Sequence, residues 1–230
     1  MVSALLSALA LVAPCDCAGC GAPDVELCPE CRARLSRTPT VSELPDGTPM
    51  VSALVYEGVV RDVVLAFKQG GRYRLAGPLG SALQAALEVV AGLGRGDSPV
   101  VSDGSGVSGA PRSIAVLAVP SSRAGLRRRG YDPVALLVRA AHGVCAQPAL
   151  TIRGRSGSQK SRSRVERLAA RAGTIRCSDY WAGRPVVIVD DVATSGATLA
   201  EAVRAAREAR AIVVAACCVA ATPLVSAKAP

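Results

Sequence analysis

Apolar residues fall into short β-branched runs that alternate along the chain with longer segments of helical periodicity. The runs predict strands and the periodic segments predict helices, because side chains repeat at every second residue in a strand and about every 3.6 residues in a helix. Strands are predicted at residues 50–56, 113–119, 186–189 and 211–221. Helices are predicted at residues 59–68, 75–93, 134–141 and 199–210. The alternation predicts an α/β fold in which helices flank a central parallel sheet, with a ligand site at the carboxyl edge of the strands.

Three segments lack this alternation. Residues 1–12 are apolar but too short to span a bilayer and have no basic residue before them, so we expect a helix packed on its own protein and no membrane association. Residues 38–49 contain several prolines and are predicted to be a linker. Residues 93–112 are rich in Gly, Ser and Asp, which predicts a disordered surface insertion. Without an export signal, the expected location is cytoplasmic.

Composition restricts the partners of the chain. Half of the 230 residues are hydrophobic and 3% are aromatic, so Ala, Val and Leu must build the core. The formal net charge is +9, and most basic residues are arginines, which suit planar contacts with phosphate or carboxylate groups. Charge alone does not separate a polyphosphate substrate from a nucleic acid. The scarcity of aromatic residues argues against a surface that stacks bases.

The most informative stretch is residues 184–198, which predicts a strand, a turn and the start of a helix. The strand ends in Asp190 and Asp191, and the turn after it is built from small and hydroxylated residues, namely Ala193, Thr194, Ser195, Gly196, Ala197 and Thr198. Backbone N–H groups at such a helix start suit a phosphate monoester. The two carboxylates would repel a phosphate, so they are better suited to sugar hydroxyls or to a cation that accompanies the ligand.

Cysteines gather near the amino end of the chain. Cys17 and Cys20 form one C-x-x-C pair, and Cys28 and Cys31 form a second. Four thiolates at this spacing can hold one tetrahedral Zn²⁺, and Cys15 could substitute for Cys17. A disulfide framework and an iron–sulfur cluster are the alternatives. We expect residues 1–40 to form a helix and this cysteine module, and residues 41–230 to form the α/β domain.

Basic residues follow several predicted elements. Lys68 ends a helix before two glycines, where it could contact an anionic ligand or favour the helix dipole, and the local sequence favours the second role. The strand at residues 113–119 leads into Pro120, Ser121 and Ser122 and then into an arginine cluster that includes Arg129. That cluster is either an anion site or a solvated loop. Residues 153–167 carry six basic side chains and predict a closing loop, a nucleic-acid contact or a solvated tether.

The acidic pair and its turn resemble the binding motif of type I phosphoribosyltransferases, which hold phosphoribosyl pyrophosphate (PRPP). Further motifs narrow the resemblance to the ComF/GntX family, namely the paired C-x-x-C, Lys68 before a glycine pair, Arg-Gly-Tyr at residues 129–131 and Gln159 with Glu166-Arg167. The family's R-G-F-N-Q pattern appears here as Arg-Gly-Tyr-Asp-Pro. The resemblance implies a Rossmann-like phosphoribosyltransferase core with a zinc knuckle.

The resemblance also implies roles for individual residues. Asp190 and Asp191 would bind the ribose hydroxyls, and residues 193–198 would wrap the 5′-phosphate. Lys68 and the segment 120–122 would contact the ligand, Arg129 would neutralise pyrophosphate, and residues 159–167 would close over the site. The implied activity is a Mg²⁺-dependent transfer of the phosphoribosyl group to an unidentified acceptor, such as a nucleobase. The alternative is a non-catalytic zinc-containing adaptor that binds single-stranded DNA or a helicase, since the family is linked to DNA uptake in competent bacteria as well as to metabolism.

Overall fold

The computed structural model describes residues 15–36, 38–94, 114–142, 149–152 and 173–222. A five-stranded sheet lies at its centre, in the order β1-β2-β7-β6-β3. Its strands are β1 (Thr40–Glu43), β2 (Pro49–Val55), β3 (Ala115–Ala118), β6 (Pro185–Ala193) and β7 (Ile212–Ala221). The helices are α2 (Pro29–Ala33), α3 (Gly58–Gln69), α4 (Ala76–Leu93), α5 (Arg123–Arg129), α6 (Pro133–His142) and α8 (Ala197–Glu208).

Four strands of the sheet are parallel, which confirms the predicted α/β architecture. β7 pairs with β2 and with β6, and β3 pairs with β6, all in parallel register. The prediction of a linker at residues 38–49 is wrong, because β1 lies in this segment and pairs with β2 in antiparallel register. β1 is only four residues long and mostly exposed, so it lacked the apolar alternation that predicts a strand. The turn between β1 and β2 ties it to the sheet.

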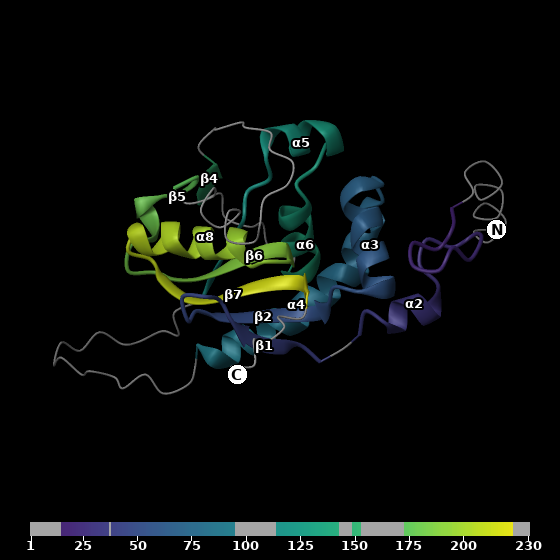
Figure 1. The fold of residues 1–230 in the computed structure, drawn as a ribbon, viewed down its shortest axis with the longest axis horizontal. Helices are drawn as coiled ribbons and strands as arrows, with labels where there is room; N and C mark the ends of the chain where they lie inside the picture. Colours follow the sequence, from purple (N-terminus) through teal and green to yellow (C-terminus); the bar gives the residue numbers. More distant parts are fainter. Residues whose placement is uncertain (1–14, 37, 95–113, 143–148, 153–172, 223–230) are drawn as a thin grey trace, which may run out of the picture.

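Helices cover both faces of the sheet (Figure 1). Successive residues of β6 point to opposite faces, so Val187 and Val189 join α3, α4 and α6 in one core cluster. Val186 and Ile188 join α8 in the second cluster. β7 contributes to both clusters and ends in residues with almost no exposed surface, including Cys217 and Cys218. The central strands are therefore buried on both sides, as their nearly continuous apolar sequence requires.

α4 with the short turn before it, residues 73–93, is the one segment among the described residues that is long and apolar enough to cross a membrane. Half of this segment is buried within the protein, because α4 packs against β2, β7 and α6. The core helix of a soluble domain meets the same criteria, so the packing of α4 against the sheet explains its apolar sequence.

The predicted insertion and the predicted N-terminal helix fall mainly outside the described residues. Of residues 93–112, only Leu93, the last residue of α4, and Gly94, which caps it, are described. Residues 1–12 and 153–167 lie wholly outside the description.

A second, two-stranded sheet packs on α8. It consists of β4 (Leu150–Ile152) and β5 (Ile175–Cys177), which pair in antiparallel register. The buried carboxylate of Glu201 on α8 accepts a hydrogen bond from the Ile175 backbone N–H at 3.0 Å and is held by Arg204 through Nε at 2.7 Å. Burial raises the pKa of Glu201, but the hydrogen bonds from Arg204 and Ile175 outweigh it and leave the pKa below its usual value. Glu201 therefore anchors β5 to the helix as an ionised group.

The N-terminal cysteine segment docks on α3 at one end of the molecule (Figure 1). Cys17, Cys28 and Cys31 are buried and belong to the same core cluster as the apolar face of α3. Gly19 allows this approach, since a Cβ at Gly19 would lie 2.7 Å from Cys31 Sγ and 2.8 Å from a Val59 methyl group. The segment thus packs directly on the α/β core.

Candidate active site and cysteine cluster

β6 delivers the two predicted aspartates to the carboxyl edge of the sheet. Asp190 is 9% exposed and Asp191 is 7% exposed. Asp190 Oδ1 accepts a hydrogen bond from the Asp191 backbone N–H at 2.8 Å. Asp191 Oδ1 accepts hydrogen bonds from the Val192 backbone N–H at 2.7 Å and from Lys68 Nζ at 2.9 Å. Two adjacent carboxyl groups are therefore buried at a strand end, beside one ammonium group.

Burial, followed by the nearby charge of Asp191, raises the pKa of Asp190, which lies at about 8. The ammonium group of Lys68 and the backbone N–H of Asp191 act in the opposite direction and lower this pKa. Lys68 comes from the last turn of α3 and lies 123 residues before Asp191 in the chain. The local sequence favoured a role for Lys68 at the helix end, whereas its ammonium group pairs with the acidic site.

The turn after β6 leads directly into α8. Gly196 has a left-handed φ of 69° and occupies the position before the first helical residue. No side chain at this position caps the helix, although Ser195 Oγ accepts a weak hydrogen bond from the Ala197 N–H at 3.4 Å. Thr222 fixes the other side of the turn, donating from Oγ1 to the Thr194 carbonyl at 2.7 Å. The first backbone N–H groups of α8 therefore lie at the end of β6, where they could bind an anion.

The end of β3 supplies a second polar group to the same edge. Arg129, at the end of α5, donates from Nη2 to Ser121 Oγ at 3.2 Å. Its Nε is buried and has no hydrogen-bond partner in the described part of the chain. Gly125 makes room for this guanidinium group, since a Cβ at Gly125 would lie 2.8 Å from Arg129 Nη2. A buried donor without an acceptor suits a ligand oxygen.

Ser122 lies in the predicted segment and has a structural role at the start of α5. Its Oγ accepts a hydrogen bond from the Gly125 backbone N–H at 3.1 Å and so caps α5, and Ser122 does not line the cleft described below. α5 itself was not predicted, because the arginine cluster has no apolar face. A serine cap and the left-handed Gly130 at its end define this short helix instead.

These groups surround one cleft with a volume of about 420 Å³. Of the predicted ligand-binding residues, all except Ser122 line it, namely Lys68, Pro120, Ser121, Arg129, Asp190, Asp191, Ala193, Thr194, Ser195, Gly196, Ala197 and Thr198. The cleft lies beyond the carboxyl ends of β2, β3 and β6, where an open parallel sheet binds its ligands.

Residues 124–227 match the family model of the phosphoribosyl transferase domain. The match includes Arg129, the acidic pair and the turn at residues 193–198, and it begins after Lys68 and the cysteines. A phosphoribosyltransferase domain implies PRPP as substrate and a glycosyltransferase-type activity. No curated protein matches the chain.

Several residues around this cleft were not predicted from the sequence. Tyr56, Leu65 and Gln69 line it. Asp132 caps α6 by accepting from the Val134 N–H at 3.0 Å, and its other oxygen accepts from the Ser121 N–H at 3.3 Å. The Asp-Pro sequence at the start of α6 is a typical helix-start signal and could have identified this cap. The tyrosine, glutamine and leucine carry no such local signal.

The Arg-Gly-Tyr segment of the domain contacts α3. Tyr131 donates its hydroxyl to the Phe67 carbonyl, and the two rings lie 5.7 Å apart between centroids. The Tyr131 hydroxyl therefore adds a polar contact at the end of α3, one residue before Lys68.

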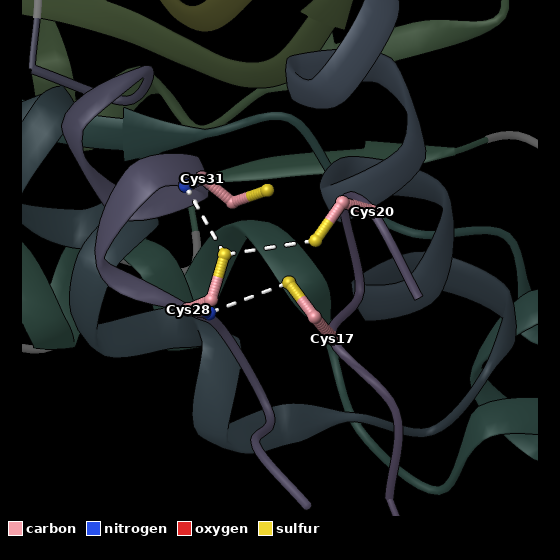
Figure 2. Close-up of side chains that lie close together, drawn as sticks. All are labelled: Cys17, Cys20, Cys28 and Cys31. Atoms are coloured by element: carbon pink, nitrogen blue, oxygen red, sulfur yellow. Dashed lines mark hydrogen bonds between the residues drawn. The ribbon is translucent and has the colours of Figure 1, made fainter. Parts of the chain in front are cut away.

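The four predicted cysteine ligands form a cluster outside the matched domain. The thiol groups of Cys17, Cys20, Cys28 and Cys31 point toward one another (Figure 2), and their sulfurs all lie within 4.8 Å of one another. Four sulfurs bound at about 2.3 Å to one tetrahedral ion lie about 3.8 Å apart, so the cluster fits a single ion. In an iron–sulfur cluster the thiolates bind different iron atoms and are farther apart, so the observed spacing favours one ion.

Backbone donors prepare the cluster to hold a cation. Cys17 Sγ accepts from the Cys28 N–H at 3.3 Å, and Cys28 Sγ accepts from the Cys31 N–H at 3.4 Å. Burial raises the pKa of Cys17, but hydrogen bonds from three backbone N–H groups outweigh it and lower the pKa to about 6, whereas the pKa values of Cys28 and Cys31 lie above the usual value. A thiolate is the form that binds a metal. Cys15 is exposed and is not part of the cluster.

Proposed function

We propose that the protein is a phosphoribosyltransferase of the ComF/GntX type that binds PRPP with Mg²⁺ and transfers the phosphoribosyl group to an unidentified acceptor, with release of pyrophosphate. The observation that supports this most strongly is the cleft itself. It combines the acidic pair, a helix start whose N-cap glycine offers no side-chain acceptor and an arginine with an unpaired buried donor in one volume. We further propose a cytoplasmic location and a structural Zn²⁺ on the four clustered cysteines.

Each part of PRPP has a chemically suitable partner in this proposal. The carboxyl groups of Asp190 and Asp191 accept hydrogen bonds from the ribose hydroxyls. The amides of residues 196–199 and the hydroxyls of the turn donate to the 5′-phosphate. Arg129 and the Ser121 region lie at the neighbouring strand end, where they meet the pyrophosphate oxygens.

The reaction breaks the bond between the anomeric carbon and a pyrophosphate oxygen, and the electron pair leaves with pyrophosphate. The acceptor supplies the electron pair for the new bond to the same carbon and loses its proton to solvent. Positive charge develops on the ribose ring and negative charge on the leaving group. The carboxyl oxygens of the acidic pair stabilise the first, and Arg129 stabilises the second. A bound Mg²⁺ would neutralise further charge on the pyrophosphate, and the cleft offers the hard carboxylate oxygens that this ion prefers.

Binding can be tested by isothermal titration of PRPP in the presence of Mg²⁺. We expect the wild type to bind and the double variant Asp190→Asn/Asp191→Asn to lose at least about tenfold in affinity, because two carboxyl groups are replaced by amides, which accept hydrogen bonds more weakly and cannot ionise. Asp179→Asn, an exposed change of the same type in the turn after β5, is the matched control and should bind as the wild type does. Equal binding by the double variant would exclude the proposed ribose site.

Turnover and acceptor can be tested together by measuring pyrophosphate release from PRPP in the presence of individual nucleobases. Release that depends on one base and on Arg129 would support transfer. Binding of PRPP without release in any combination would leave a PRPP-binding protein and contradict the enzymatic part of the proposal.

The adaptor alternative depends mainly on the basic residues at 153–167, which lie outside the described residues. No observation in the described part of the chain favours a nucleic acid or helicase partner over PRPP.

A further inference from the structure

The chain reverses sharply after α3, and two glycines make the reversal possible. The Ala66 carbonyl accepts hydrogen bonds from the Gly70 N–H at 3.0 Å and from the Arg72 N–H at 3.4 Å. A Cβ at Gly70 would lie 2.8 Å from that carbonyl oxygen, and Gly71 has a left-handed φ of 67°. The turn therefore fixes Arg72 relative to the last turn of α3, which carries Lys68.

Arg72 bridges this turn to the cysteine segment. Its Nη2 donates to the Asp16 carbonyl at 2.6 Å and to the Glu26 carbonyl at 3.1 Å. Its Nε lies 3.8 Å from the Glu26 carboxylate. Asp16 directly precedes the cluster member Cys17, and Glu26 lies two residues before Cys28. One guanidinium group thus binds both branches of the cysteine segment next to their metal-binding positions.

The same helix reaches the candidate active site. Lys68 lies four residues before Arg72, and its Nζ is 2.9 Å from Asp191 Oδ1. At its other end, α3 contacts the cysteine segment through Val59, which packs near Gly19 and Cys31. The cysteine segment therefore holds α3 at both ends, and α3 presents Lys68 to the acidic pair.

We propose that Arg72 is a positioning residue that couples metal binding at the four cysteines to ligand binding at the acidic pair. The coupling to ligand rests on the proposed function. A bound ion fixes Cys17 and Cys28 and so holds the carbonyls of Asp16 and Glu26 where Arg72 needs them. Without the ion these acceptors move apart, the turn after α3 loosens, and Lys68 loses its fixed distance to Asp191.

The first experiment uses hydrogen exchange of the full-length zinc-loaded protein and needs no ligand. We expect Arg72→Gln to raise exchange of the amides at residues 66–72 by at least about fivefold while the zinc content stays unchanged. Arg74→Gln is the matched control, because Arg74 is exposed, lies in the short helical turn that follows, and its side chain makes no polar contact among those found in the described residues. Equal exchange in Arg72→Gln and wild type would overturn the proposal.

The second experiment measures zinc loss to a chelator with and without PRPP. Coupling between two binding sites is reciprocal, so PRPP should slow zinc loss from the wild type by at least about fivefold. It should give little protection in Arg72→Gln and partial protection in Arg72→Lys, which keeps the charge but not the two-pronged contact. Equal protection in Arg72→Gln and wild type would overturn the coupling. If the wild type failed to bind PRPP at all, the proposed function would fall, while the exchange experiment would still decide whether Arg72 links the cysteine segment to α3.

Discussion

Asp190 is a site residue whose surroundings oppose its ionisation. It is a carboxyl group at the end of a buried strand, beside Asp191 and opposite Cys218 of β7. Its pKa is raised from the ordinary aspartate value of 3.8 to about 8, first by burial and then by the charge of Asp191. A group with a raised pKa in the folded state stabilises the fold below its unfolded pKa, and this contribution is lost as the pH rises toward the folded pKa.

Asp190→Asn should therefore stabilise the ligand-free protein while it weakens PRPP binding. Asparagine keeps the oxygen that accepts from the Asp191 N–H and cannot ionise, so it avoids the cost of either burying a charge or taking up a proton on folding. We expect a gain of at least about 1 kcal/mol in the free energy of unfolding at pH 7, and a gain that grows between about pH 4 and pH 8. Urea unfolding at pH 4.5, 6 and 7.5 measures it. A gain of equal size at every pH would contradict this origin.

The backbone conformation and the surroundings of Gly196 both disfavour a side chain at this position. Its φ of 69° is unfavourable for other residues, and a Cβ there would lie 3.1 Å from a Leu44 methyl group. Leu44 lies in the turn between β1 and β2, so a side chain at position 196 would press against that turn.

Gly196→Ala should destabilise the protein by about 1–2 kcal/mol, and Gly183→Ala is its matched control. Gly183 has a similar φ of 68°, and a Cβ there would meet no atom within 4 Å. The difference between the two variants in chemical denaturation measures the cost of the Leu44 contact. If Gly183→Ala costs as much as Gly196→Ala, the contact is unimportant and only the backbone conformation matters.

At the scale of elements, α8 serves two partners. Its first turn faces the cleft, and its second turn holds β5 through Glu201. Glu201 is 5% exposed, and Arg204 ties it to both the backbone of Ile175 and the exposed Glu208. The helix whose first turn lines the cleft is thus fixed on its outer side by an ion pair with a buried carboxylate.

Glu201→Ala should cost about 2–4 kcal/mol of stability, because it leaves the Ile175 N–H and the Arg204 guanidinium without their buried acceptor. Glu208→Ala removes the exposed partner of the same arginine and should change stability by less than about 1 kcal/mol. Thermal unfolding of both variants checks this. Similar losses in both would show that burial does not distinguish the two carboxylates.

At the scale of the whole molecule, the cysteine segment is continuous with the main core. Cys17, Cys28 and Cys31 share a core cluster with residues of α3, α4 and α6. Arg72 adds polar contacts across the same boundary. The segment therefore stabilises the described α/β structure, although it lies outside the matched domain.

Removal of the proposed zinc should consequently lower the temperature of one shared unfolding transition. Metal binding that requires the folded cluster adds directly to folding stability, so calorimetry with a chelator should show one peak shifted downward by several degrees, about 2–4 °C per kcal/mol for a chain of this size. Loss of a small separate peak, with the main peak unmoved, would mean that the cysteine segment unfolds independently.

The sequence predicted the elements that depend on interactions between neighbouring residues in the chain. β6, its acidic end and the turn into α8 were expected because an aliphatic run, two carboxylates and a glycine-containing turn follow one another directly. The cysteine cluster was expected because ligand spacing is itself a local constraint. α5 and β1 were not predicted. A serine cap stabilises α5 and pairing with β2 stabilises β1, and neither interaction requires a periodic pattern of apolar residues.

Contacts between distant segments could not be predicted from local patterns. The pairing of Lys68 with Asp191 joins residues 123 positions apart, and Arg72 reaches the Asp16 carbonyl across 56 positions. Each depends on where the fold places two elements. Tyr56 and Gln69 were missed as cleft residues for the same reason, since only the assembled sheet edge brings them near the acidic pair.

The two adjacent thiols of β7 give the protein an internal reporter. Cys217 and Cys218 have no exposed surface, and burial raises the pKa of the Cys217 thiol to about 12 and that of Cys218 well above its usual value. An alkylating reagent attacks the thiolate, so both should stay unmodified while the sheet is intact. Exposed Cys15, by contrast, is accessible throughout. Mass spectrometry of the alkylated peptides would then measure how often the central strand opens. In the same experiment, alkylation of the N-terminal thiols would measure how many molecules lack the metal.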